Sequence, residues 1–155
     1  MNLTRRTFLR AGLTGGTVTV ALAAGLLSPG SVLAAWPASA FQAQSVEDAL
    51  KALGEANTTE SPAITVQAPD IAENGAVVSV TVSTTLPQVE SISVLAKDNT
   101  SPLTASYLLA DATEGYVSSR IKMRKTSDVI AVVRAGGKVY TAKKSVKVTL
   151  GGCGG

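Results

Sequence analysis

The chain has 155 residues, 45% hydrophobic and 16% charged, which is enough for one domain of ordinary size and too apolar for a disordered chain. It contains no histidine and one cysteine, so it cannot build a Ser-His-Asp triad, a Cys-His pair, an internal disulfide or a His- or multi-Cys metal site. The formal charge of +3 comes from Arg5, Arg6 and Arg10, without which eleven basic residues face eleven acidic ones, so it does not indicate a nucleic-acid partner.

Residues 1–35 are predicted to be an export signal. Arg5 and Arg6 precede Thr-Phe-Leu, an uncharged run follows, and small residues stand before the expected cleavage after Ala34 or Ala35. This pattern resembles the twin-arginine (Tat) motif and predicts a folded protein exported to the periplasm. A retained membrane helix is disfavoured by several glycines and Pro29, so no stable membrane association is expected after cleavage.

Residues 36–150 are predicted to form one domain that begins with a short helix over 45–54. Ser45 and Asp48 fit a helix start, the apolar residues that follow share one face, and Gly54 fits the stop. A helix this short must dock on other structure, with Trp36, Pro37 and Phe41 as expected anchors.

The remainder of this domain has the period of two that is typical of β-strands. We expect about seven strands, at 64–68, 76–83, 91–94, 107–110, 117–124, 128–134 and 138–150. Turn signals separate them, and Gly136-Gly137 indicates a two-residue hairpin. The predicted class is all-β, an immunoglobulin-like β-sandwich with a short N-terminal helix and a flexible Gly-rich C-terminal arm.

Charge divides unevenly along this part of the chain. Residues 36–100 carry a net charge of −6 and residues 101–155 carry +6. One interpretation is that these are solvated strand faces. The other is that Arg120, Lys122 and Arg124 steer an anion.

Residues 151–155 read Gly-Gly-Cys-Gly-Gly and are predicted to be a swinging arm made of Gly151, Gly152, Cys153, Gly154 and Gly155. Five extended residues reach roughly 16–18 Å, and an exposed thiol titrates near ~8.5. The residues by themselves leave several roles for Cys153: a substrate-carrying thiol, an intermolecular disulfide, a conjugation handle or an incidental residue on a frayed tail.

The terminal pentapeptide resembles that of the SoxY family, the sulfur-carrier subunit of the Sox thiosulfate-oxidising system. Similarity extends to 36–41, 45–54, 68–78, 125–129 and 131–133, and so covers nearly the whole chain after the signal. The resemblance implies that Cys153 is the point of covalent attachment. It also implies a carrier that is not an enzyme and that has no cofactor, catalytic residue or metal site of its own.

The same resemblance implies partners. They are a SoxZ-like subunit in a heterodimer, a c-type cytochrome that joins thiosulfate to the cysteine, a hydrolase that releases sulfate and a sulfane dehydrogenase. The alternative hypothesis is a structural immunoglobulin-like module of the periplasm that dimerises through a Cys153 disulfide.

Overall fold

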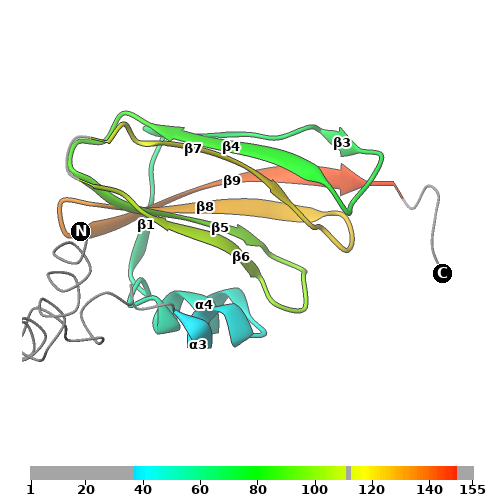
Figure 1. Cartoon of the computed structure of the whole chain (residues 1–155), viewed down its shortest axis with the longest axis horizontal. Helices are drawn as coiled ribbons and strands as arrows, with labels where there is room; N and C mark the ends of the chain where they lie inside the picture. The colour runs from blue at the N-terminus through cyan, green and yellow to red at the C-terminus, as the bar shows by residue number, and fades with distance from the viewer. Residues whose placement is uncertain (1–36, 111–112, 150–155) are drawn as a thin grey trace, which may run out of the picture. The chain divides into compact units, whose positions relative to one another are not determined.

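The computed structural model describes residues 37–110 and 113–149, which form two helices and two stacked β-sheets (Figure 1). The helices are α3 (Ala38–Gln42) and α4 (Val46–Ala52). The strands are β1 (Thr58–Glu60), β2 (Ile64–Gln67), β3 (Ile71–Ala72), β4 (Val78–Thr84), β5 (Val89–Ala96), β6 (Leu103–Leu108), β7 (Tyr116–Ile121), β8 (Ser127–Ala135) and β9 (Lys138–Val148). The predicted signal peptide with Arg5 and Arg6, the anchor Trp36 and the predicted arm with Cys153 lie outside the described residues.

The two sheets confirm the predicted β-sandwich. The larger sheet has the order β1-β9-β8-β5-β6, and β3 also pairs with β9. The smaller sheet has the order β2-β4-β7, with antiparallel neighbours. The described residues hold nine strands rather than about seven, because β1 and β3 were not predicted, and β6 lies at Leu103–Leu108 rather than at 107–110.

The core between the sheets is aliphatic, as the alternating sequence predicts. Val78, Val80 and Val82 of β4 are buried, whereas the side chain of Ser79 is exposed. They pack in one cluster with residues of the larger sheet, among them Ile92, Val94, Val129, Ala131, Val133 and Val146. Strands of period two therefore turn one face to this core and the other outward.

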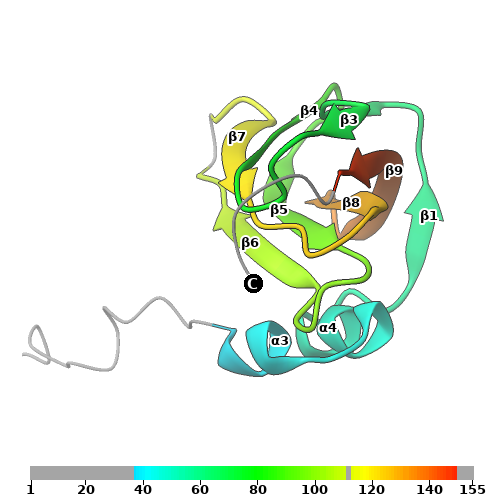
Figure 2. The ribbon, with the colours of Figure 1, turned by 90° about the vertical axis from the view of Figure 1, so that its right-hand side faces the viewer.

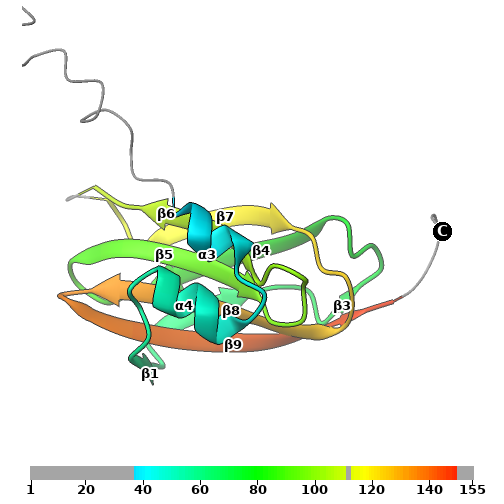
Figure 3. The same cartoon turned by 90° about the horizontal axis from the view of Figure 1, so that it is seen from below.

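The two helices cover the outer face of the larger sheet, across β5 and β8 (Figure 3). Ala40 of α3 and Ala49 of α4 pack with Leu95 and Val132 in a second apolar cluster. Strand β5 is therefore buried on both faces from Ser91 to Ala96, serines included. Within the described residues, no helix is long and apolar enough to cross a membrane.

Helix α4 begins and ends with the predicted capping residues. The Ser45 hydroxyl accepts a hydrogen bond from the Asp48 amide at 3.0 Å, and Gly54 adopts φ +70°, a left-handed conformation that favours glycine. Helix α3 was not predicted. It is a single turn that begins after Pro37, and Phe41 in it packs against the second cluster, in keeping with its expected role as an anchor.

An ion pair between the buried Glu55 and the partly exposed Arg134 fastens the end of α4 to the sheet. Glu55 is only 3% exposed, and its Oε1 accepts hydrogen bonds from Arg134 Nε at 3.4 Å and from Ser91 Oγ at 3.3 Å. Arg134 also donates to the Leu53 carbonyl at 3.1 Å. Burial raises the pKa of the Glu55 carboxyl above its ordinary value of 4.5, although Arg134 and the Ser91 hydroxyl act in the opposite direction.

The chain crosses between the two sheets along one side of the sandwich. β1 pairs with the start of β9, β2 pairs with β4 of the other sheet, and β3 returns to pair with the end of β9. Figure 2 shows β1 on this side and the edge strands β6 and β7 on the opposite side. β3 thus pairs with the last two residues of β9, Lys147 and Val148.

Candidate functional site

The described part of the site is the root of the predicted arm, the last residues of β9. Lys147 donates its amide to the Asp70 carbonyl at 2.9 Å, and Thr149 donates its amide to the Ala72 carbonyl at 3.0 Å. Strand β3 thus holds one edge of β9 as far as Thr149. The chain that leads to Cys153 therefore starts from a backbone fixed by a parallel strand pair.

A threonine side chain holds the other edge of the root. The pairing of β8 with β9 begins at Ser127 and Val146, so β8 offers no strand partner to the last residues of β9. Thr126 supplies one instead, because its hydroxyl accepts from the Val148 amide at 2.9 Å and lies 3.4 Å from the Val148 carbonyl. This single hydroxyl continues the hydrogen bonding of the sheet beyond its last strand pair.

Three loops come together around this root: residues 73–77, 97–102 and 122–126. The Met123 amide donates to the Gly75 carbonyl at 2.7 Å and joins the first loop to the third. The Asn99 side chain joins the second loop to the third, because it donates to the Lys122 carbonyl at 2.6 Å and accepts from the Arg124 amide at 3.0 Å. The end of the sandwich is therefore a connected set of loops rather than three independent ones.

Gly75 lies where the loops leave no room for a side chain. A Cβ atom there would overlap the Met123 carbonyl oxygen and approach Val148 Cγ1 to 2.8 Å. The φ of Gly75 is not in the left-handed region, so backbone conformation does not require glycine here. Glycine is required because the two backbones approach closely. The contact with Val148 connects this loop directly to the root.

The three residues predicted to steer an anion fall in two places. Lys122 and Arg124 lie exposed in the loop 122–126, and Nη1 of Arg124 donates to the Thr100 hydroxyl. Arg120 lies on β7 opposite Ser79, in a shallow hollow on the smaller sheet that Ser118 also lines. The fold therefore places two of the three in the loops at the root and the third on the neighbouring strand, and their action on an anion stays a prediction.

Charge around the root is predominantly positive. The three loops hold four basic residues, Lys97, Lys122, Arg124 and Lys125, against the two acids Glu73 and Asp98, and all six are exposed. The carboxylate of Asp70 pairs with Lys144 at 3.0 Å. Among the described residues, no group of three His, Cys, Asp or Glu side chains lies close enough to hold a metal ion.

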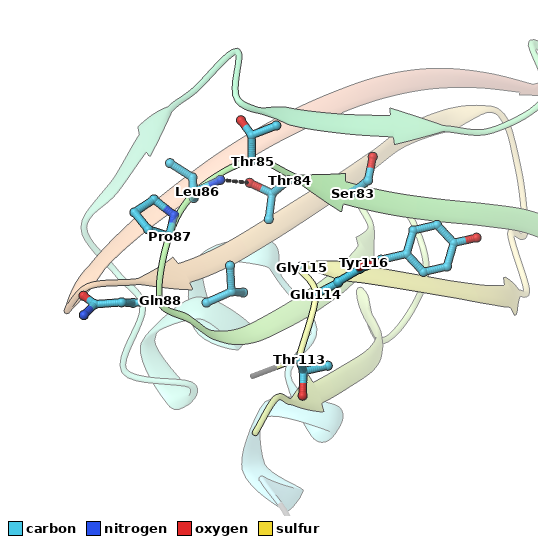
Figure 4. A pocket seen from close by; sticks show the side chains of 11 residues that line it. Ser83, Thr84, Thr85, Leu86, Pro87, Gln88, Thr113, Glu114, Gly115 and Tyr116 are labelled. Carbon is cyan, nitrogen blue, oxygen red and sulfur yellow. Dashed lines mark hydrogen bonds between the residues drawn. The ribbon is translucent and has the colours of Figure 1, made fainter. Parts of the chain in front are cut away.

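A second hollow lies at the opposite end of the sandwich, where β4 ends and β5 and β7 begin (Figure 4). Its lining combines hydroxyl-bearing residues with the apolar Leu86, Pro87 and Val89, and the Leu86 amide donates to Thr84 Oγ1 at 3.1 Å. Glu114 is the one charged side chain among the residues that line it. The hollow is built by the turn 84–88 and lies far along the strands from the root.

Sequence reasoning missed three residues of the root: Gly75, Asn99 and Thr126. The sequence marks their surroundings only as turns between predicted strands. Thr126 and Asn99 form hydrogen bonds with residues that are 22 and 25 positions away along the chain, and no local sequence pattern marks such pairs. Asparagine and threonine in a predicted turn are the available signal, but turns favour these residues for local reasons too.

Comparison with known proteins relates this architecture to a family. The family model "Sulfur oxidation protein SoxY" matches residues 49–153. The chain belongs to the SoxY family. The match includes the three loops and the whole of β9, and it extends to Cys153. The suspected resemblance is thereby confirmed.

A solved SoxY structure agrees with this assignment. The chain is 43% identical to the sulfur carrier protein SoxY from Chlorobium limicola f thiosulfatophilum, with a TM-score of 0.63 over 74% of this chain and 100% of that one. No curated protein gives a significant match.

More distant structures share only the fold. Superoxide reductase (neelaredoxin) from Ignicoccus hospitalis and a variant of the same protein are each 17% identical to the chain, with TM-scores of 0.50 and 0.51. The alignments cover 56% and 59% of this chain and 80% and 83% of theirs. The sandwich is therefore not confined to the SoxY family, and the function must be argued from the site.

Proposed function

We propose that the protein is a covalent carrier of sulfur intermediates, with Cys153 as the attachment point. The family match and the Chlorobium structure support a sulfur carrier of the Sox system. One observation connects the proposal to a particular residue. The family match extends to the one cysteine of the chain, which lies four residues beyond Thr149, the last residue with a backbone hydrogen bond to Ala72.

The chemistry of loading needs an external oxidant. The Cys153 thiolate and thiosulfate join through a new S–S bond to give Cys-S-S-SO₃⁻, and the two electrons released pass to the haems of a c-type cytochrome. Hydrolysis then adds water, breaks the terminal S–S bond, and releases sulfate and two protons, which leaves a persulfide on Cys153. The carrier supplies the thiolate and its position, and partner enzymes supply the redox and hydrolytic groups.

The carrier is proposed to act in the periplasm after export by the twin-arginine route, as a heterodimer with a SoxZ-like subunit. The motif at Arg5 and Arg6 supports the export route. A partner that has no signal of its own would cross while bound, because this route carries folded proteins. A sulfane dehydrogenase is the proposed acceptor of the persulfide.

Intact-mass analysis tests the proposal. The purified complex is incubated with thiosulfate and the loading cytochrome, and the mass of this chain is followed with time. We expect a mass gain of one S₂O₃ group at Cys153, converted to a gain of one sulfur atom when the hydrolase is added. Cys153→Ser should show neither gain. A disulfide dimer as the sole product, with thiosulfate turnover unaffected by Cys153→Ser, would establish the structural module instead.

A further inference from the structure

The short distance from the root to the thiol restricts where a partner can sit. Thr149 is the last described residue, and four residues of chain carry the backbone from it to Cys153. At roughly 3.3–3.6 Å for each residue, the cysteine lies at most about 14 Å from Thr149. A protein that takes Cys153 into its own active site must therefore cover part of the end of the sandwich where β9 ends (Figure 1).

This end carries two exposed apolar side chains. Ile71 is 57% exposed and Val77 is 54% exposed, and they belong to the group of four large exposed hydrophobic side chains in the described residues. Ile71 is paired in register with Lys147 on β9. Val77 closes the loop 73–77, whose Gly75 contacts Val148. Both apolar side chains thus lie within a few residues of the root.

The charged residues in the loops at this end are mostly basic. The loops at the root hold four bases and two acids, whereas the described loop residues at the other end of the sandwich, 85–88, 109–110, 113–115 and 136–137, hold no basic residue. Exposed apolar side chains together with charged loops at one end of a domain are typical of a protein interface rather than of ordinary solvated surface. The predominance of bases means that the matching surface is acidic at its rim.

We propose that the end of the sandwich formed by Ile71, Val77 and the basic loop residues Lys122 and Arg124 is the docking face for the enzymes that Cys153 enters. The partner surface is an apolar patch with an acidic rim, placed around the mouth of the channel that receives the arm. This inference rests on the proposed carrier function and adds the surface through which the carrier is recognised. Binding at the root brings the thiol within reach without contacts elsewhere on the sandwich.

The experiment separates docking from loading by charging the thiol chemically. Tetrathionate transfers an S–SO₃⁻ group to the Cys153 thiolate and releases thiosulfate, so no loading enzyme is needed. The chain with its partner subunit is charged in this way, equal adduct is verified by intact mass, and sulfate release by the hydrolase is measured against carrier concentration. The variants are Ile71→Ser with Val77→Ser, and Lys122→Glu with Arg124→Glu.

A matched control pair lies at the opposite end of the sandwich. Leu108 is 76% exposed and Tyr116 is 54% exposed, so their double replacement by serine removes a comparable apolar area from another place. We expect the KM for the carrier to rise about tenfold or more in both root variants, which corresponds to a loss of about 1.4 kcal/mol of binding. We expect kcat to stay unchanged, and the control pair to keep the KM of the unaltered carrier. The effect of the charge variant should decrease as salt is added.

The outcomes are distinguishable. If the unaltered carrier is charged but releases no sulfate, the proposed function fails and this inference fails with it. If the unaltered carrier works and the root variants keep its KM, the docking face is wrong and the carrier function stands. A rise in KM for the Leu108 and Tyr116 pair as large as for the root pair would also overturn the docking face.

Discussion

Replacement of Gly75 by alanine tests whether close packing of the loops fixes the root of the arm. The added Cβ would overlap the Met123 carbonyl oxygen and lie 2.8 Å from Val148 Cγ1, so the loop 73–77 must move away from β9. Overpacking of this kind costs about 1–3 kcal/mol. We expect a value in the upper half of that range, because one of the two contacts is with backbone. For a domain of this size the melting temperature should fall by about 5–15 °C.

Gly115 provides a control with the same kind of clash at the other end of the sandwich. A Cβ there would lie 2.6 Å from Thr84 Cγ2 and 3.2 Å from the Thr84 carbonyl oxygen. Gly75→Ala and Gly115→Ala should therefore lose similar stability in urea unfolding. They should differ in amide hydrogen exchange, because only the Gly75 variant is expected to speed the exchange of the Val148 and Thr149 amides.

The reasoning would be refuted by two results. If Gly75→Ala leaves exchange at Val148 and Thr149 unchanged while it lowers stability, the loop does not hold the root. If adding Val148→Ala restores the stability of the Gly75 variant, the side-chain contact dominates rather than the backbone one. We expect no such rescue, because the Met123 amide is hydrogen-bonded to the Gly75 carbonyl at 2.7 Å and holds the two backbones together.

Two side chains and the length of the arm lead to predictions of their own. Burial raises the Glu55 pKa, so between about pH 4.5 and that raised value the folded state binds more protons than the unfolded state, and the contribution of Glu55 to stability falls as pH rises. In urea titrations over this pH window, the stability of Glu55→Gln relative to the unaltered protein should therefore rise with pH. Parallel stability curves for the two proteins would contradict this prediction. Asn99→Ala removes both bonds that join two root loops and should cost about 1–3 kcal/mol in the same measurement, whereas Asn57→Ala, at an exposed asparagine between α4 and β1, should cost less than half as much. Deletion of residues 151–152 shortens the reach of Cys153 from Thr149 to roughly 7 Å. The deletion should reduce enzymatic sulfate release by at least about tenfold, while the rate at which iodoacetamide alkylates the thiol stays unchanged. An equal loss of sulfate release and of alkylation would show a folding defect instead.

Local sequence was sufficient for the elements whose structure depends on near neighbours. The Ser45 and Asp48 pair gives the start of α4, and Gly54 gives its end, because these interactions span a few residues. Gly136 and Gly137 form the predicted hairpin with φ of +56° and +72°. The alternation of Val78, Val80 and Val82 with polar residues gives a strand with one buried face.

Elements that depend on distant partners were not predictable in this way. β3 is two residues long, too short to show a period, and it exists because β9 is available to pair with Ile71 and Ala72. β1 is exposed and polar, and it owes its conformation to pairing with the start of β9. Helix α3 forms one turn, for which packing on Leu95 and Leu103 matters more than propensity.

The sequence alone determined that the chain has one thiol, and that glycines separate it from the last strand, because composition and order are read directly. It also carried the resemblance by which the SoxY family was suspected. Only the tertiary structure decided what surrounds the base of that arm. Residues 73–77, 97–102 and 122–126 are far apart along the chain, and they come together because strand pairing brings the ends of β3, β5 and β9 and the start of β8 to one end of the sandwich.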